Sequence, residues 1–402
     1  TIPYVKGRLV FAELVARAME NGSFDLVLVD LPCFMNNEEC LAIPARLFPM
    51  GSSLVILKET DSYMTIPFVP NDAPCAAIAM VKMLREWGGS IDLRCIDDSN
   101  VINYHEYLQY PEVKLKDDYF VFVDGIEVYF EQPFRQMEGL WNNLPDTQRS
   151  FLEHRASIVK EYLDGYLRKG KKTLFICEYK LWWIISKSLE MGKQDKKTHL
   201  FITWKDLSAA IVVEDPYLLW AMGLLDDFPG VVLQFYSKLK EGFLQSFDKL
   251  EAINTLIKAA ISQAERRPSI REAVVFQHYL RKLLCASLRL TPLLVEHLYD
   301  AALSCVGKHF ADVMARKLLH YPCPDMDKVL NYISIQKDTV MLTGEIFIIP
   351  ELSQRDFLYT GLSGPSLNTP YDKRIDLVNK VHPHIYKMEL TELKEAGGNT
   401  WA

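Results

Sequence analysis

Residues 25–32 read DLVLVDLP. Four consecutive apolar residues between two aspartates are typical of a strand buried on both faces, as the strands of a parallel sheet are. Similar short apolar runs recur in the first half of the chain, at 2–5, 53–57, 91–96 and 173–177. Helical patterns separate most of these runs, and such alternation favours parallel strands covered by helices. The predicted fold class is therefore α/β, with an N-terminal, mostly parallel sheet flanked by helices.

Two further patterns lie within this half of the chain. From Phe151 to Leu167, apolar side chains recur at helical spacing until Gly170, which predicts a core helix over 146–169. Ahead of it, two apolar runs flank Asp124-Gly125, the pair most favoured in the two-residue turn of a β-hairpin. We therefore predict a hairpin insertion at about 117–131.

The pattern changes near residue 205, where long helical stretches begin. Near the end of the chain, 329–335 and 340–349 become β-like, and a turn-rich tail follows them. We predict three parts: an α/β domain over 1–205, a mainly α-helical domain over 206–325, and a β-containing C-terminal segment with the tail over 326–402.

Composition limits the class of protein. The chain has 402 residues, with 45 Lys+Arg against 52 Asp+Glu, a net charge of −7 that argues against general nucleic-acid binding. Eight scattered cysteines form no C-x-x-C pair, which fits a reducing compartment. No run of about 18 apolar residues predicts a membrane span, and the first residues lack the pattern of a signal peptide. We therefore expect a soluble, cytoplasmic protein.

The common cofactor motifs are missing from the sequence. It contains no G-x-G-x-x-G after the first strand, no phosphate-binding G-x-x-x-x-G-K-[ST], and no G-x-S-x-G nucleophile elbow. The one local pair of metal-ligand residues, His382 and His384, flanks a proline, which favours a surface turn. The sequence predicts no cofactor and no metal.

Candidate site residues follow from the predicted sheet. In open α/β sheets, ligands bind beyond the carboxyl ends of the strands, so the polar residues there are the first candidates. The predicted catalytic candidates are Asp30, Glu59, Asp98, Glu178 and Lys180. The predicted ligand-binding candidates are Arg8, Asp72, His154 and Arg155, and Asp72 is also expected to cap a helix.

Five segments carry a family resemblance over roughly residues 1 to 205. They are 5–8 after the first strand, 25–32, 67–72, the helix around His154-Arg155, and 174–180. In this order they resemble the α/β superfamily that joins erythromycin esterases, the haem-binding ChaN lipoproteins and TraB-type proteins. The resemblance implies a histidine just after the glycine of the first strand, an acid after the second strand, and another histidine after a late strand.

This chain keeps the acid of that set, as Asp30, whereas Leu9 and Val10 stand where the first histidine is expected and Lys180 stands near the second. The predicted function is therefore a binding or complex-forming protein with a degenerate site, a pseudoenzyme, whose partner is an unidentified small molecule or protein. The oligomeric state stays open.

The alternative is a hydrolase, with or without metal assistance. Its general acid/base groups would come from Asp30, Glu59, Asp98 and Glu178, while Arg8, Lys180 and His154 would stabilise anionic groups. Three or more of these seven residues in one pocket would favour chemistry, and their dispersal would favour binding.

Overall fold

The structure is a computed structural model, and it describes part of the chain. The described residues are 1–36, 41–42, 44–45, 48–57, 63–97, 113, 115–190, 207–214, 216–221, 225, 228–242, 246–286, 293–321, 331–336, 339–342, 355–357, 374 and 377. Among them, no helix is both long and apolar enough to cross a membrane.

A four-stranded parallel sheet forms the centre of the N-terminal half. Its strands are β1 (Ile2–Tyr4), β2 (Leu26–Pro32), β5 (Asp92–Asp97) and β6 (Thr173–Glu178), in the spatial order β1-β6-β2-β5. All three pairings are parallel. The predicted α/β fold class is confirmed.

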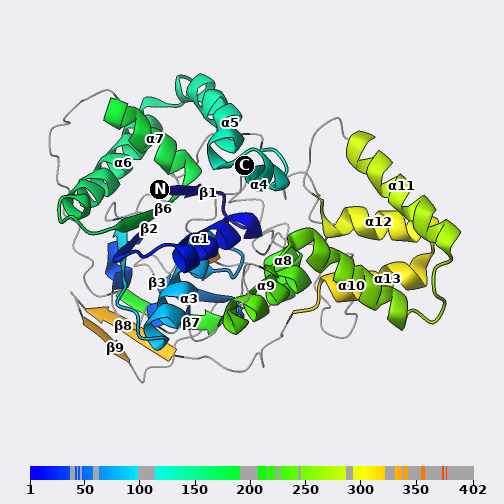
Figure 1. Ribbon diagram of the computed structural model, residues 1–402. Helices are drawn as coiled ribbons and strands as arrows, with labels where there is room; N and C mark the ends of the chain where they lie inside the picture. Colours follow the sequence, from blue (N-terminus) through cyan, green and yellow to red (C-terminus); the bar gives the residue numbers. More distant parts are fainter. Residues whose placement is uncertain are drawn as a thin grey trace.

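Helices cover both faces of this sheet (Figure 1). On β2, Val27 and Val29 pack with α1 (Leu9–Asn21) and α3 (Ala73–Glu86), whereas Leu26 and Leu28 point the other way. The second face packs against α6 (Asp146–Leu167) and α7 (Tyr179–Glu190). Alternate residues of a strand face opposite sides, so an uninterrupted apolar run is what a doubly covered strand requires.

The predicted hairpin at 117–131 is wrong. Two helices stand there, α4 (Tyr119–Val123) and α5 (Ile126–Trp141), with Gly125 between them at φ +87°. A glycine at positive φ suits either a hairpin turn or a break between helices. The helical spacing of buried Tyr129, Pro133 and Met137 decides the outcome, because it places one stripe of α5 against the core.

A second sheet lies beside the first. Its order is β10 (Arg355–Phe357), β4 (Tyr63–Phe68), β3 (Ser52–Leu57), β7 (Leu207–Val213), β8 (Asn331–Gln336) and β9 (Thr339–Leu342). All its pairings are antiparallel except β10 with β4. The strand expected at 53–57 therefore belongs to this mixed sheet, and β7 interrupts the part predicted as helical. An apolar run does not encode its partner, which is non-local.

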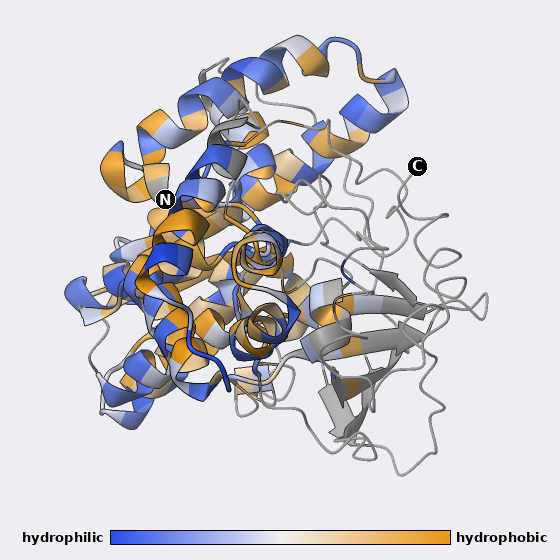
Figure 2. Ribbon diagram, turned by 90° about the vertical axis from the view of Figure 1, so that its right-hand side faces the viewer, coloured by the Kyte–Doolittle hydropathy of each residue, from blue (hydrophilic) through white to orange (hydrophobic). Residues whose placement is uncertain are grey.

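The helical part that follows comprises α8 (Pro216–Ala221), α9 (Pro229–Glu241), α10 (Lys249–Gln263), α11 (Ile270–Ala286), α12 (Val295–Cys305) and α13 (Lys308–Leu318). In Figure 2 these and the other described helices carry both hydrophobic and hydrophilic residues, as amphipathic helices do. The outer end of this part lies away from the sheets (Figure 1).

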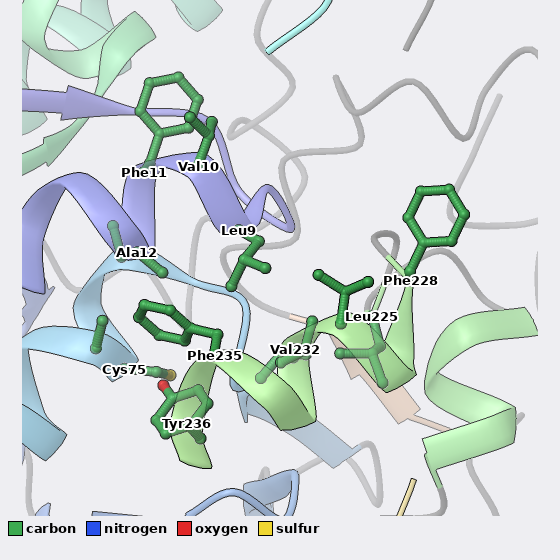
Figure 3. Close-up of a cluster of buried hydrophobic side chains, with 14 of the residues drawn as sticks. Leu9, Val10, Phe11, Ala12, Cys75, Leu225, Phe228, Val232, Phe235 and Tyr236 are labelled. Atoms are coloured by element: carbon green, nitrogen blue, oxygen red, sulfur yellow. The ribbon is translucent and has the colours of Figure 1, made fainter. Parts of the chain in front are cut away.

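The helical part joins the α/β half through a shared core. Leu9 and Ala12 of α1 lie with Val232 and Phe235 of α9 in one buried cluster (Figure 3). The thiol of Cys75, on α3, lies beside the hydroxyl of Tyr236, which donates a hydrogen bond of 2.8 Å to the carbonyl oxygen of Pro70. A continuous core of this kind positions α9 relative to the parallel sheet.

Candidate functional site

The carboxyl ends of the parallel strands meet at one edge of the sheet, and charged side chains gather there. We call the set Lys6, Asp30, Asp72, Arg155 and Glu178 the edge cluster. Asp30 lies on β2 and Glu178 ends β6, while Lys6 follows β1, Asp72 precedes α3 and Arg155 projects from α6. Five segments far apart in sequence therefore supply one cluster.

Asp30 is held by two hydrogen bonds. Its Oδ1 accepts from the hydroxyl of Tyr4 at 3.1 Å, and its Oδ2 accepts from the backbone N–H of Glu178 at 2.8 Å. Burial raises the pKa of Asp30 to about 6, although the Glu178 N–H, Arg155 and Lys6 all favour the ionised form. The Asp30 carboxyl is therefore expected to change its protonation state near pH 6.

Asp72 and Asn71 hold the turn after β1. The backbone N–H of Gly7 donates to Asp72 Oδ1 at 2.5 Å, and the Asn71 amide donates to the Gly7 carbonyl oxygen. Gly7 has φ +72°, which favours glycine. Asp72 stands at the N-cap of α3, as expected, but its side chain bonds to Gly7 and makes no capping hydrogen bond to the helix. Burial raises the pKa of Asp72 to about 6.

Lys6 lies among three carboxylates. Its ammonium nitrogen is buried. Burial lowers the pKa of Lys6, and Glu178, Asp30 and Asp72 oppose that change, in this order of strength. Its position directly after the first strand places Lys6 among the polar residues expected at this edge of the sheet, although it is not one of the predicted catalytic or ligand-binding candidates.

Arg155, the last member of the edge cluster, forms a buried ion pair with a residue next to the cluster. Its Nε donates to Oδ2 of Asp97, the last residue of β5, at 2.8 Å, and both side chains are almost fully buried. The neighbouring His154 is half-buried, and no contact described in the structure joins it to the edge cluster. Adjacent residues of a helix point about 100° apart, so only one of this pair faces the sheet.

Arg8 belongs to a second network. Its Nη1 donates to Asp118 Oδ1 at 2.5 Å, to the Lys116 carbonyl oxygen at 3.0 Å and to the Tyr129 hydroxyl at 2.8 Å. Lys249, on α10, donates to Asp118 Oδ2 at 3.2 Å. Burial alone would raise the pKa of Asp118, but Arg8 and Lys249 outweigh it and hold that pKa below its usual value. Arg8, only 2% exposed, therefore ties α1 to the helical part.

The other candidates are placed as follows. Lys180 is buried in the first turn of α7, with its ammonium 5.8 Å from the centre of the Tyr179 ring, and that ring stacks on Phe130. Glu59 and Asp98 lie outside the described residues. The described contacts thus bring together Asp30 and Glu178 of the catalytic candidates, and Asp72 and Arg155 of the ligand-binding candidates.

The arrangement suits proton exchange and recognition of charge. Two carboxyl groups with pKa values of about 6 surround a buried lysine, a combination typical of functional sites. Within the part of the chain that the structure describes, no group of three or more His, Cys, Asp or Glu residues is arranged to hold a metal ion.

Comparisons of this chain with models of known families, with characterised proteins and with solved structures give no match. The class of protein therefore rests on the fold and the edge cluster: an α/β protein with charged side chains at the carboxyl edge of a parallel sheet.

Proposed function

We propose that this chain is a binding protein that takes up a small ligand at the edge cluster. The observation that carries the proposal is the convergence of five charged side chains, from five separate segments, at the carboxyl edge of the parallel sheet. Burying charges costs stability even when they are paired, so a set of this size calls for a role besides folding. The carboxyl edge is also where open α/β sheets bind ligands.

The charge balance of the cluster favours a ligand with a positively charged group. Asp30, Asp72, Glu178 and the Asp97 partner of Arg155 supply four carboxylates, against the two cations Lys6 and Arg155. The described groups therefore sum to 2 − 4 = −2 when all are ionised. An ammonium group would offset this charge, and its affinity would rise as Asp30 and Asp72 lose their protons above pH about 6.

A thermal-shift series tests this proposal, with methylammonium and ethylenediamine as cationic probes and acetate and phosphate as anionic ones. Ligands that bind the folded state raise the melting temperature. We expect the amines to raise the melting temperature more at pH 7.5 than at pH 5. These two pH values lie about one unit or more above and below the carboxyl pKa values. The rise should be lost in Asp30→Asn.

Asp92→Asn is the matched control, because Asp92 is a half-exposed carboxylate at the opposite end of β5. Equal responses of the two variants, or stabilisation by the anions alone, would contradict recognition of a cation at the edge cluster.

Hydrolysis is the second candidate, and the two carboxyl pKa values of about 6 favour it. General acids and bases work best when their pKa lies near the working pH. Of the seven residues assigned above to hydrolysis, the structure describes five, and its contacts bring together Asp30 and Glu178, while Glu59 and Asp98 lie outside the described residues. Turnover of p-nitrophenyl acetate that disappears in Asp30→Asn but persists in Asp92→Asn would establish hydrolysis over binding alone.

A further inference from the structure

The outer face of α11 is exposed, and none of the residues that the structure describes covers it. Phe276 and Leu280 face the core, whereas Ile270, Val274 and Val275 point outward, and Ile270 is 86% exposed. Apolar side chains at this spacing form a stripe along one side of a helix. The described helical part thus presents apolar surface to its surroundings.

The same side of α11 is basic. Arg271, Arg281 and Lys282 are exposed there. The helix contains a single acid among residues 270–286, Glu272, and its carboxylate accepts hydrogen bonds from Ser269 and Arg266. We call the set Ile270, Arg271, Val274, Val275, Arg281 and Lys282 the α11 face. A mixed apolar and basic face of this kind fits a surface that is apolar and acidic.

Such a surface exists elsewhere on the same chain. Where α4 meets α5, Phe122, Val123 and Val128 are exposed, and Val123 reaches 58%. Asp124, Glu127 and Glu131 are exposed beside them, and Glu131 forms an ion pair with the exposed Arg135 one turn further along α5. We call the three apolar and three acidic residues the α4–α5 corner. It matches the α11 face in kind: three apolar side chains with three acids, against three apolar side chains with three bases.

We propose that the α11 face of one copy of this chain docks onto the α4–α5 corner of a second copy. Both surfaces are exposed in the same molecule, so they do not cover each other within it. Two copies carry −7 each and repel at long range, so an association needs local opposite charges such as these.

The geometry of the assembly follows from the two surfaces being different. Figure 1 shows α11 at the outer end of the helical part, apart from α4 and α5. A contact between unlike surfaces is made either reciprocally, in a two-fold dimer in which each α11 face meets the corner of the other copy, or head to tail, which leaves one α11 face and one corner free in each pair. The assembly is therefore a two-fold dimer, a larger closed ring or an open chain of copies.

Sedimentation velocity over a range of concentrations and salt tests the proposal. We expect the wild-type protein to associate at concentrations of about 10 µM or above in low salt, and less in high salt because salt screens exposed charges. Arg271→Glu with Arg281→Glu should weaken association at least tenfold. Asp124→Lys with Glu127→Lys should do the same.

The decisive arm mixes these two double variants. In each double variant the α11 face and the corner carry charge of the same sign, so copies of one variant repel each other. The acidic α11 face of one variant is complementary to the basic corner of the other, so the mixture should associate again. Arg168→Glu with Lys169→Glu makes the same charge change at the exposed end of α6 and should leave association unchanged.

A wild-type protein that stays monomeric in low salt would overturn the proposal. So would association that neither double variant weakens, or a mixture that fails to associate although both variants melt like the wild type. Binding of the wild type to phosphatidylserine vesicles without self-association would assign the α11 face to an anionic membrane instead.

Discussion

Replacing Arg8 by methionine tests the network that joins α1 to the helical part. The substitution keeps most of the side-chain volume but removes the hydrogen bonds to Asp118, Lys116 and Tyr129. Removing one partner of a buried ion pair costs about 3–5 kcal/mol. Because Lys249 still neutralises Asp118 in part, we expect a loss near the lower end, about 3 kcal/mol. That is a large share of a typical unfolding free energy of about 5–15 kcal/mol.

Urea denaturation monitored by circular dichroism measures this loss. Arg149→Met is the matched control, because Arg149 forms an ion pair with the exposed Asp146 on α6 and such pairs contribute little. Arg8→Lys should fall between the wild type and Arg8→Met, since it keeps the charge but not the planar group that contacts three oxygens.

The pH dependence adds a second readout. The folded-state pKa of Asp118 is lowered, so the pairing stabilises the protein above the usual aspartate pKa of 3.8 and is lost as pH falls below it. The difference between wild type and Arg8→Met should therefore be complete at neutral pH and shrink in acid. A loss no larger than that of Arg149→Met, or one independent of pH, would refute the role assigned to Arg8.

Three further predictions concern the core, the edge cluster and the turn after β1. Leu163→Asp places a carboxylate in the core beneath α6, where Leu163 is 6% exposed, and should cost several kcal/mol, about enough to prevent folding; a soluble variant that melts cooperatively would contradict a core role for this helix. Burial raises the pKa of Asp30 from 3.8 to about 6, so the contribution of this carboxyl to stability decreases as pH rises from about 4 to about 6. In urea titrations, Asp30→Asn should therefore become more stable relative to wild type over that pH interval. Gly7→Ala forces an alanine into φ +72° and should lower stability by about 1 kcal/mol or more, whereas an unchanged urea midpoint would show that the turn adapts.

Much of the α/β half is predictable because the signals that define its elements are local. Four apolar residues between Asp25 and Asp30 are enough to indicate β2, and the helical spacing that ends at Gly170 is enough to indicate α6. Strand and helix periods are encoded within ten or twenty residues, so these elements can be predicted without knowledge of their partners.

Where local signals compete, the outcome depends on packing. Asp124-Gly125 carries a strong turn signal, yet residues 119–123 and 126–141 are helical, because Phe130 of α5 stacks on Phe11 and on Tyr179. The same holds for Tyr63–Phe68, where Pro67 weakens the strand pattern although β4 pairs with β3 along its length.

For the candidate site, the sequence by itself determined that polar side chains, Asp30 and Glu178 among them, follow buried strands and so lie at one edge of the sheet. Only the tertiary structure decided which charges meet there: Lys6 and Arg155 join the edge cluster, whereas Arg8, two residues after Lys6, turns toward Asp118 more than a hundred residues away. The physical reason is that strand and helix periods are local properties of the chain, while a charge finds its partner only when non-local packing has removed both from water.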